Sequence, residues 1–409
     1  MIFLGSDNII KPHETNEAVE DYRQKRGAKY AKAKAGNSAM KVLMISSSYP
    51  KDPEDWRGGF VSNLVYAMAQ KKRVQLHLWA PPGEMPSSVL NGLTNDESIW
   101  LGKLTERGGI AHVLRTGGIQ GIFVAAKLLS KLRKVYLRNP DADIVHVNWL
   151  QNALPLWGMR KPAVISVLGS DYGLLRYPFM VLLLRSVIRQ RRCILAPNAD
   201  WMVKGLEKHF GDIAEIRFVP FGVKDMWFEM KRNQPPQARR KWIVVSRVTA
   251  KKIGSLFSWG KMIFGDEDEL HLLGPMQEQI TIPAWVHYHG ATHPAALHDQ
   301  WFPEATGLIT LSDHDEGRPQ VMLEAMAARL PIIASDIQAH RNMIEHRQTG
   351  WIAKTREDFR EGLKWLSASD TNVKIGFAAS EWVRQHIGTW DDCAERYLAT
   401  YEKLAGIDK

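Results

Sequence analysis

Two glutamates eight residues apart, Glu316 and Glu324, have settings that suit contacts to a bound ligand. Glu316 lies in SDHDEGRP, which is typical of a loop, and Glu324 lies in VMLEAMAA, where helix formers fill nearly every position. The apolar runs GLITL and PIIAS flank them, so the stretch predicts a strand, a loop, a helix and a second strand. Because open α/β sheets bind ligands at the carboxyl ends of their strands, both carboxylates are candidate ligand contacts.

Two cations nearby suit a phosphate ligand. Arg247 follows the apolar run WIVVS, and Lys252 comes five residues later, so both can reach the tip of that predicted strand. Fixed positive charges at such a place suit a nucleotide diphosphate, because they stabilise the negative charge that grows on a leaving phosphate. The helix predicted from about Pro319 adds free N–H groups and the positive end of a helix dipole, which also favour an anion.

A glycine pair in the first half of the chain offers a third contact to phosphate. Gly58 and Gly59 follow the first predicted strand in DWRGGFVSNL. Glycines at this position let the backbone approach a pyrophosphate closely, and the helix expected from about Phe60 directs its N-terminus the same way. The segment is not a G-x-G-x-x-G fingerprint, so the sequence disfavours a nicotinamide cofactor.

The elements that must position these residues alternate between strands and helices along the whole chain. Short apolar runs, each closed by polar, Gly or Pro residues, are MKVLMI, VQLHLWA, DIVHVNW, PAVISVLG, CILAPN and IRFVPFG, then WIVVSRV, ELHLLG, WVHYHG, GLITLS and PIIAS. Helix-length segments separate them, which predicts parallel, doubly wound sheets. The 409 residues are enough for two such α/β domains.

The sequence also predicts where the domains begin and end. Residues 1–39 are polar without apolar periodicity, which predicts a mobile tail. A first Rossmann-like domain is expected over 40–230, and the charged, proline-containing run KRNQPPQARRK predicts a linker over 231–240. A second Rossmann-like domain is expected over 241–389, and apolar residues at helical spacing predict a terminal helix over 390–409.

With these features in order, the chain resembles the retaining glycosyltransferases of family 4, which have the GT-B fold of two Rossmann-like domains facing each other across a cleft. The stretch EGRPQVMLE is similar to the E-x7-E element of that family. Further segments similar to the family's landmarks are RGGFVSNL, GSD at Gly169 to Asp171, VPFGV, SRVTAKK and HLLGP. The resemblance implies transfer of a hexose from a nucleotide diphosphate sugar, of UDP or GDP type, to a glycan or lipid-linked acceptor in cell-surface polysaccharide or glycolipid synthesis.

The resemblance also implies roles for individual residues. Glu316 would contact the donor sugar, Glu324 the ribose hydroxyls, and Arg247 with Lys252 the phosphates. The segment between the glutamates would hold the sugar hydroxyls and the phosphate through Gly317, Arg318, Gln320 and Val321. Arg318 and Gln320 stand in a part of the motif where the family often has an aromatic residue and glycine, so they are expected to affect sugar preference.

The first domain departs from the family pattern at one position. Many relatives have a histidine before the glycine of the GSD-like element, where this chain has Leu168. His146, in DIVHVNW, is a candidate substitute for that contact, although a histidine at a strand end is commonly structural. Asp171 is expected either to bind the acceptor or to support its loop, and the sequence does not decide between these roles.

No metal or other cofactor is expected. Asp313 to Asp315 read DHD, which mimics a D-x-D metal motif, but the resemblance implies metal-independent catalysis and these residues can cap the helix instead. His287, His289 and His293 alternate along a strand and enter a loop, which is not the arrangement of a zinc site.

Charge distribution points to a partner for the first half of the chain. Residues 1–230 hold 32 basic and 21 acidic residues, a net charge of +11, whereas residues 231–409 have a net charge of −1. GIQGIFVAAKLLSKLRKVYLR, from Gly118, predicts an amphipathic helix whose basic residues are Lys127, Lys131, Arg133 and Lys134. Such a helix can lie on an anionic membrane surface, as a lipid-linked acceptor would require.

The expected location is cytoplasmic, with peripheral contact to the inner face of a membrane. The opening MIFLG is too short for a signal peptide, no apolar run is long enough to span a bilayer, and the two cysteines suit a reducing compartment. Two other functions stay open: a nucleotide-sugar epimerase on the same fold, and a basic nucleic-acid-binding protein. Nucleic acid is the less favoured partner, because the sequence contains no recognised DNA- or RNA-binding module.

Overall fold

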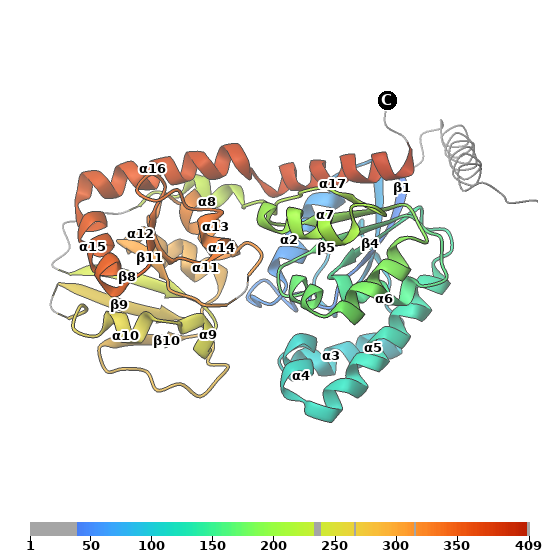
Figure 1. Ribbon diagram of the computed structural model, residues 1–409, viewed down its shortest axis with the longest axis horizontal. Helices are drawn as coiled ribbons and strands as arrows, with labels where there is room; N and C mark the ends of the chain where they lie inside the picture. Colours follow the sequence, from blue (N-terminus) through green and yellow to red (C-terminus); the bar gives the residue numbers. More distant parts are fainter. Residues whose placement is uncertain (1–38, 233–238, 266, 315, 407–409) are drawn as a thin grey trace, which may run out of the picture.

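A computed structural model of the chain describes residues 39–232, 239–265, 267–314 and 316–406. Within these ranges the chain forms two α/β domains that lie side by side, each built on one parallel sheet with helices against both faces (Figure 1). The predicted tail therefore lies outside the described residues, except for Ala39.

The first domain contains a seven-stranded sheet with the order β3-β2-β1-β4-β5-β6-β7. Its central strands are buried along their whole length, as parallel strands covered on both faces require. The strands are β1 (Met40–Ile45), β2 (Val74–Trp79), β3 (Leu90–Asn91), β4 (Ile144–Asn148), β5 (Ala163–Val167), β6 (Cys193–Pro197) and β7 (Glu215–Ile216). The helices are α2 (Gly59–Ala69), α3 (Asn95–Glu106), α4 (Ile110–Thr116), α5 (Gly118–Arg138), α6 (Pro178–Ile188) and α7 (Val203–Phe210), with the 3-10 helices η1 (Leu150–Leu156), η2 (Tyr172–Arg176) and η3 (Asp200–Met202).

The second domain contains a six-stranded sheet with the order β10-β9-β8-β11-β12-β13. Its strands are β8 (Arg240–Val245), β9 (Asp268–Leu273), β10 (Val286–Gly290), β11 (Gly307–Thr310), β12 (Ile332–Ser335) and β13 (Trp351–Ala353). Its helices are α8 (Asp225–Glu229), α9 (Ala250–Ile253), α10 (Leu256–Gly260), α11 (Pro294–Ala296), the π-helix η4 (Leu297–Trp301), α12 (Phe302–Glu304), α13 (Gln320–Ala327), α14 (Gln338–Arg341), α15 (Arg356–Ser367) and α16 (Ser369–His386).

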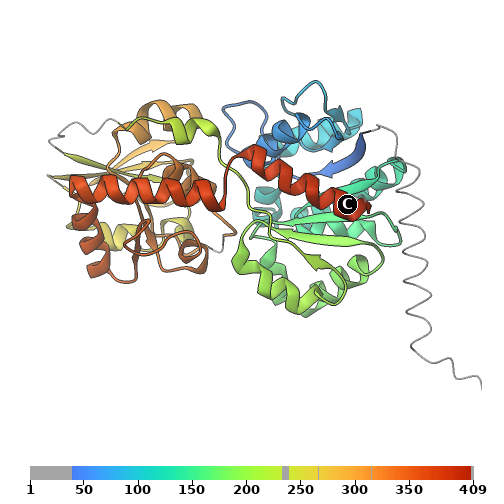
Figure 2. The same ribbon diagram turned by 90° about the horizontal axis from the view of Figure 1, so that it is seen from above.

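The chain passes between the domains twice. Trp227 and Phe228 of α8 are buried in the core of the second domain, so the first passage precedes α8. The chain then returns through α17 (Trp390–Ala405), which follows α16 and buries Tyr397 and Tyr401 in the core of the first domain (Figures 1 and 2). Helix α17 agrees with the predicted terminal helix, although it packs on the domain distant in sequence.

Two sequence predictions about elements and limits differ from the structure. The first domain was expected to extend to residue 230 and the linker to span 231–240, but the crossing lies earlier, and residues 233–238 lie outside the described residues. The run IRFVPFG was predicted as a strand, and the strand β7 itself is only Glu215–Ile216, although the backbone N–H groups of Arg217 and Val219 also donate to carbonyls of β6. Pro220 lacks a backbone N–H and ends this pairing, and the chain crosses between Phe221, which is buried in the first-domain core, and Val223, which is buried in the second.

Candidate active site

Adjacent strands bring the second-domain candidates together. Strands β8 and β11 pair in parallel, so the loops that follow them leave the same edge of the sheet. One loop leads to α9, whose N-cap Thr249 Oγ1 accepts a hydrogen bond from the backbone N of Lys252 at 3.3 Å. The other carries Glu316, and the ammonium of Lys252 forms an ion pair with the Glu316 carboxylate. Both side chains are largely buried, with 13% and 15% of their surface exposed.

The electrostatics of this pair keep Glu316 ionised. Burial acts to raise the pKa of Glu316, but the Lys252 ammonium outweighs it and holds the pKa below its ordinary value, with smaller contributions from His340 and His314. Arg247 lies in the loop that leads from β8 to α9, is half-buried, and places its Nη1 3.4 Å from Gln277 Oε1. An ionised carboxylate beside the cation of α9, with a second cation in the loop before that helix, can receive both hydroxyl groups and phosphate oxygens.

Helix α13 carries the second glutamate. Its N-cap, Pro319, makes no side-chain cap, so the start of the helix keeps backbone N–H groups for another acceptor. Burial raises the pKa of Glu324 to about 7, while Lys224 and Gln320 act weakly in the opposite direction. Gln320 donates from Nε2 to the carbonyl of Gly222 at 2.9 Å, and Val321 packs against the core of the second domain.

The loop between the glutamates meets the first domain directly. The carbonyl of Gly317 accepts a hydrogen bond of 2.9 Å from Trp201 Nε1. Arg318 is 8% exposed, donates from Nη2 to Asn342 Oδ1 at 2.9 Å and lies 3.6 Å from Asp200 Oδ1. Its guanidinium also lies over the ring of Phe218, 5.2 Å from the centroid, and burial lowers its pKa to about 10. Arg318 therefore stays charged in the contact between the two domains.

Two first-domain candidates, His146 and Asp171, form structural contacts. His146 is fully buried, with Nδ1 2.6 Å from Tyr401 Oη and Nε2 2.7 Å from Ser166 Oγ, and burial lowers its pKa to about 3. It joins β4 to α17, so the suggestion that it replaces the family's donor-contacting histidine is wrong. The sequence could not reveal this, because its partner on α17 is 255 residues away.

Asp171 also supports the structure around it. Its Oδ2 accepts a hydrogen bond from the backbone N of Leu150 at 2.9 Å, and its Oδ1 accepts one from Leu168 at 2.8 Å. Burial raises the pKa of Asp171 to about 6, and these backbone hydrogen bonds act in the opposite direction. The Leu168 side chain packs against the first-domain core, so this position contributes no polar side chain to a ligand.

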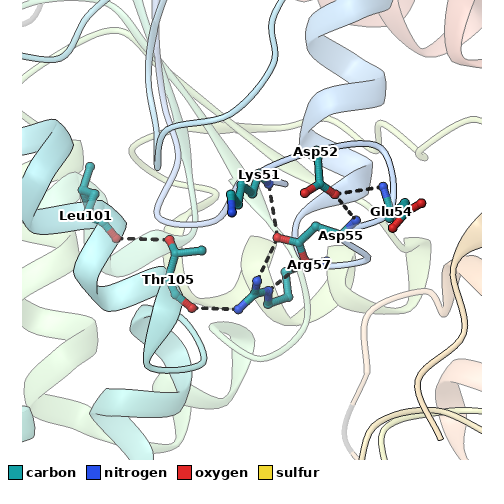
Figure 3. Close-up of polar contacts among 7 residues, drawn as sticks. All are labelled: Lys51, Asp52, Glu54, Asp55, Arg57, Leu101 and Thr105. Carbon is teal, nitrogen blue, oxygen red and sulfur yellow. Dashed lines mark hydrogen bonds and ion pairs between the residues drawn. The ribbon is translucent and has the colours of Figure 1, made fainter.

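The glycine pair stands at the end of a braced loop. Gly58 has φ +69° and a Cβ there would lie 2.7 Å from Ser48 Oγ, so glycine is required; Gly59 begins α2 as expected. Before it, Arg57 donates from Nε to Asp55 Oδ1 at 2.8 Å and from Nη1 to the Thr105 carbonyl of α3 at 2.8 Å (Figure 3). These hydrogen bonds of Arg57 hold the loop that leads into α2 against α3.

The predicted basic helix is α5, but three of its four basic side chains contact other parts of the first domain. The ammonium groups of Lys127 and Lys131 each lie 5.5 Å from the ring centroid of Trp100. Arg133 donates from Nη1 to the carbonyls of Pro155 and Trp157, at 2.9 Å and 2.6 Å, whereas Lys134 is exposed. Within the described part of the chain, no helix is long and apolar enough to cross a membrane.

Among the described residues, no group of three or more His, Cys, Asp or Glu side chains is arranged to hold a metal ion. His271 and His289 instead pair with each other, with Nδ1 and Nε2 3.0 Å apart. Metal-independent catalysis stays a prediction.

Two Rossmann-like domains with charged side chains at the strand ends define a protein of the GT-B fold, and solved structures agree. Sucrose-phosphate synthase from Thermosynechococcus elongatus superimposes with a TM-score of 0.69 at 13% identity, over 90% of this chain and 100% of that one. A UDP-forming trehalose-phosphate synthase from Burkholderia xenovorans gives 0.63 at 11% identity, over 90% and 100%. Anabaena HepE in complex with UDP and glucose gives 0.60 at 13% identity, over 88% and 99%.

Sequence comparison finds a family match for part of the second domain. Residues 261–382, which include both glutamates, match the family described as glycosyl transferases group 1. A probable sucrose-phosphate synthase from Thermosipho melanesiensis is 29% identical over 97 residues, which are 24% of this chain and 22% of that protein. These matches confirm the resemblance to group 1 glycosyltransferases and the GT-B fold. Membership of family 4 in particular stays a prediction.

Sequence reasoning missed the first-domain residues that touch the loop between the glutamates. Trp201 lies in NADWM, directly after β6, where it reads as an ordinary apolar residue at the start of a helix. The available signal was its place at the carboxyl edge of the first sheet, the same kind of edge that carries Glu316 in the second.

Proposed function

We propose that this protein is a retaining glycosyltransferase that transfers a hexose from a nucleotide diphosphate sugar, of UDP or GDP type, to a glycan or lipid-linked acceptor. The observation that carries the proposal is the buried Lys252–Glu316 pair at the carboxyl ends of β8 and β11, beside a segment that matches group 1 glycosyltransferases. The HepE structure supports a UDP-sugar as the first donor to test.

In the proposed reaction, second-domain residues bind the donor. Arg247 and Lys252 contact the diphosphate, Glu324 accepts hydrogen bonds from the ribose hydroxyls, and Glu316 accepts hydrogen bonds from the hexose. The bond between the anomeric carbon and the β-phosphate oxygen breaks, and Lys252 stabilises the negative charge that develops on that oxygen. Because Glu316 is held ionised in the closed site, it can orient the sugar without a proton transfer of its own.

Retention follows if the acceptor oxygen attacks from the face that the phosphate leaves. A new bond forms between the acceptor oxygen and the anomeric carbon, and the acceptor proton passes to the departing phosphate oxygen. The products are the glycoside and a nucleoside diphosphate. No side-chain base is needed in this scheme, which suits a site where His146 and Asp171 are engaged in supporting contacts.

Membrane contact through the first domain is part of the proposal. Helix α5 exposes Ile119, Ile122 and Phe123, with 74%, 68% and 72% of their surface accessible, and Lys134 is exposed further along the helix. Apolar side chains followed by a basic segment suit the interface of an anionic bilayer. The expected place of action is the cytoplasmic face of a membrane, where a lipid-linked acceptor would be reached.

A donor screen tests the proposal. Purified protein is mixed with UDP-, GDP- and ADP-hexoses, and thermal unfolding is recorded, because a ligand at 100 times its dissociation constant stabilises by about 2.7 kcal/mol. The stabilising donor is then incubated with glycan, lipid-linked and hexose-phosphate acceptors, and the anomeric configuration of the product is read by NMR. Isomerised donor without a glycoside would favour the epimerase, and no effect of any nucleotide sugar would reject the proposal.

A further inference from the structure

The loop that carries Glu316 rests on the first domain through backbone contacts. A Cβ atom on Gly169 would lie 2.1 Å from the Gly317 nitrogen. A Cβ on Gly317 would lie 2.5 Å from Asn198 Oδ1 and 2.8 Å from the Leu168 carbonyl oxygen. Neither position leaves room for a side chain, so the two loops approach each other as closely as glycine backbones allow.

One side chain fixes this approach with a directed bond. Trp201, in η3, donates its indole N–H to the Gly317 carbonyl at 2.9 Å. The indole is itself held in place, because it packs edge to face against Tyr172 with the ring centroids 5.0 Å apart. The peptide group that accepts this bond follows Glu316 by one residue, so a shift of this carbonyl moves the Glu316 backbone with it.

We propose that Trp201 is a positioning residue, which reaches across from the first domain, holds the Gly317 carbonyl and thereby sets the orientation of Glu316. The charged residues proposed to bind the nucleotide, Arg247, Lys252 and Glu324, all lie in the second domain. In this proposal the first domain controls the sugar-contacting loop, while the charged side chains that bind the nucleotide belong to the second domain. This inference rests on the proposed function for its kinetic consequence, but its structural consequence can be measured without any substrate.

Trp201→Phe is the decisive variant, because it removes the indole N–H and keeps an aromatic ring against Tyr172. Trp157→Phe is its matched control, since Trp157 lies in the same domain with 63% of its surface exposed. Gly169→Ala is a second variant, which separates the two loops by steric contact. Its control is Gly173→Ala, because a Cβ at Gly173 would meet nothing within 4 Å.

Hydrogen exchange of the full chain without ligand is the first measurement. In Trp201→Phe, the backbone amides of Gly317, Arg318 and residues 320–322 are expected to exchange about tenfold faster, as the loss of one partly buried hydrogen bond allows. Trp157→Phe is expected to match the wild type. Unchanged exchange in this segment of Trp201→Phe would overturn the inference, whatever reaction the protein catalyses.

Kinetics and binding form the second measurement. Both Trp201→Phe and Gly169→Ala are expected to lower kcat for sugar transfer about tenfold and to leave the affinity for UDP or GDP within twofold of the wild type. A merely structural role would lower nucleotide affinity and kcat together, and that result would also overturn the inference. If the wild type transfers no sugar, the proposed function fails, and the exchange experiment still decides the role of Trp201.

Discussion

Replacing Lys252 by methionine tests the ion pair on which the proposed reaction depends. The change keeps an apolar stem of similar length and leaves the Glu316 carboxylate without its cation. Breaking a fully buried pair costs about 3–5 kcal/mol, and because 13% and 15% of these two side chains stay exposed, we expect a loss of about 2–3 kcal/mol at pH 7. Guanidinium denaturation of both proteins measures the difference.

The sign of its pH dependence follows from the lowered pKa of Glu316. A carboxyl group whose pKa is lower in the folded state than in the unfolded state stabilises the fold above its ordinary pKa of 4.5. That contribution is lost as the pH falls through the folded-state pKa. In Lys252→Met burial alone raises the pKa of Glu316, so the difference from the wild type is expected to be largest at high pH, to shrink as the variant's Glu316 takes up a proton above pH 4.5, and to shrink further as the pH falls through the lowered pKa of the wild type.

Activity should fall more steeply than stability. Removing one fixed cation that stabilises a developing oxyanion costs about 10²–10³ in rate, so kcat/KM of Lys252→Met should fall at least about a hundredfold, as should that of Glu316→Ala. The double variant Lys252→Met with Glu316→Gln removes the uncompensated charge, so it should recover most of the stability and none of the activity. Lys251→Met, at the exposed neighbouring lysine, is the control. A kcat/KM within fivefold of the wild type for Lys252→Met would refute the assigned role.

Three other predictions concern Glu324, His146 and the exposed residues of α5. Because the pKa of Glu324 is raised to about 7, the affinity for the nucleoside diphosphate should rise as the pH increases through 7. Calorimetry at several pH values measures this affinity, and Glu324→Gln should remove that part of its pH dependence. An identical pH profile in both proteins would exclude a ribose contact. His146→Phe should lower the free energy of unfolding by about 2 kcal/mol, since the buried Tyr401 hydroxyl loses its partner and Ser166 keeps only Tyr397. It should leave kcat unchanged in the transfer assay, and a large fall in kcat at normal stability would return His146 to the active site. Ile122→Ser with Phe123→Ser should abolish cosedimentation with anionic vesicles and spare transfer to a short soluble acceptor. Replacement of the four basic residues of α5 by Gln should have the same two effects. Salt-sensitive binding of the wild type to DNA instead of vesicles would favour a nucleic-acid partner.

The sequence was sufficient for the second-domain site because the relevant information there is local. Strand, loop and helix follow one another within about 30 residues, and a parallel sheet then places the loops after β8 and β11 at one edge. Alternation of apolar runs likewise predicted the two sheets. It missed β3 and β13, which have only two and three residues and lack a pattern that distinguishes them from loops.

The first-domain site was less predictable because its residues act through partners distant in the chain. His146 is a polar residue near the end of a predicted strand, where ligand contacts are common. It is a core residue because α17 packs across the first domain and places Tyr401 beside it. Trp201 carries no ionisable group, and its contact with Gly317 spans 116 residues. No periodicity or spacing in one chain reveals such pairs, since they depend on how the two domains meet.

The two departures from the pattern of the resembling family, Leu168 and Arg318, lie on opposite sides of one contact, so one physical explanation covers both. Leu168 replaces a polar residue, its side chain packs into the first-domain core, and its carbonyl lies against Gly317. Directly after that glycine, Arg318 stays buried between Asp200 and the ring of Phe218. A buried guanidinium is costly unless other groups compensate its charge, so the contacts of Arg318 with Asp200 and Phe218 depend on the two loops lying together, and Leu168 contributes only its backbone carbonyl there. The contact between these two loops is therefore where both departures act.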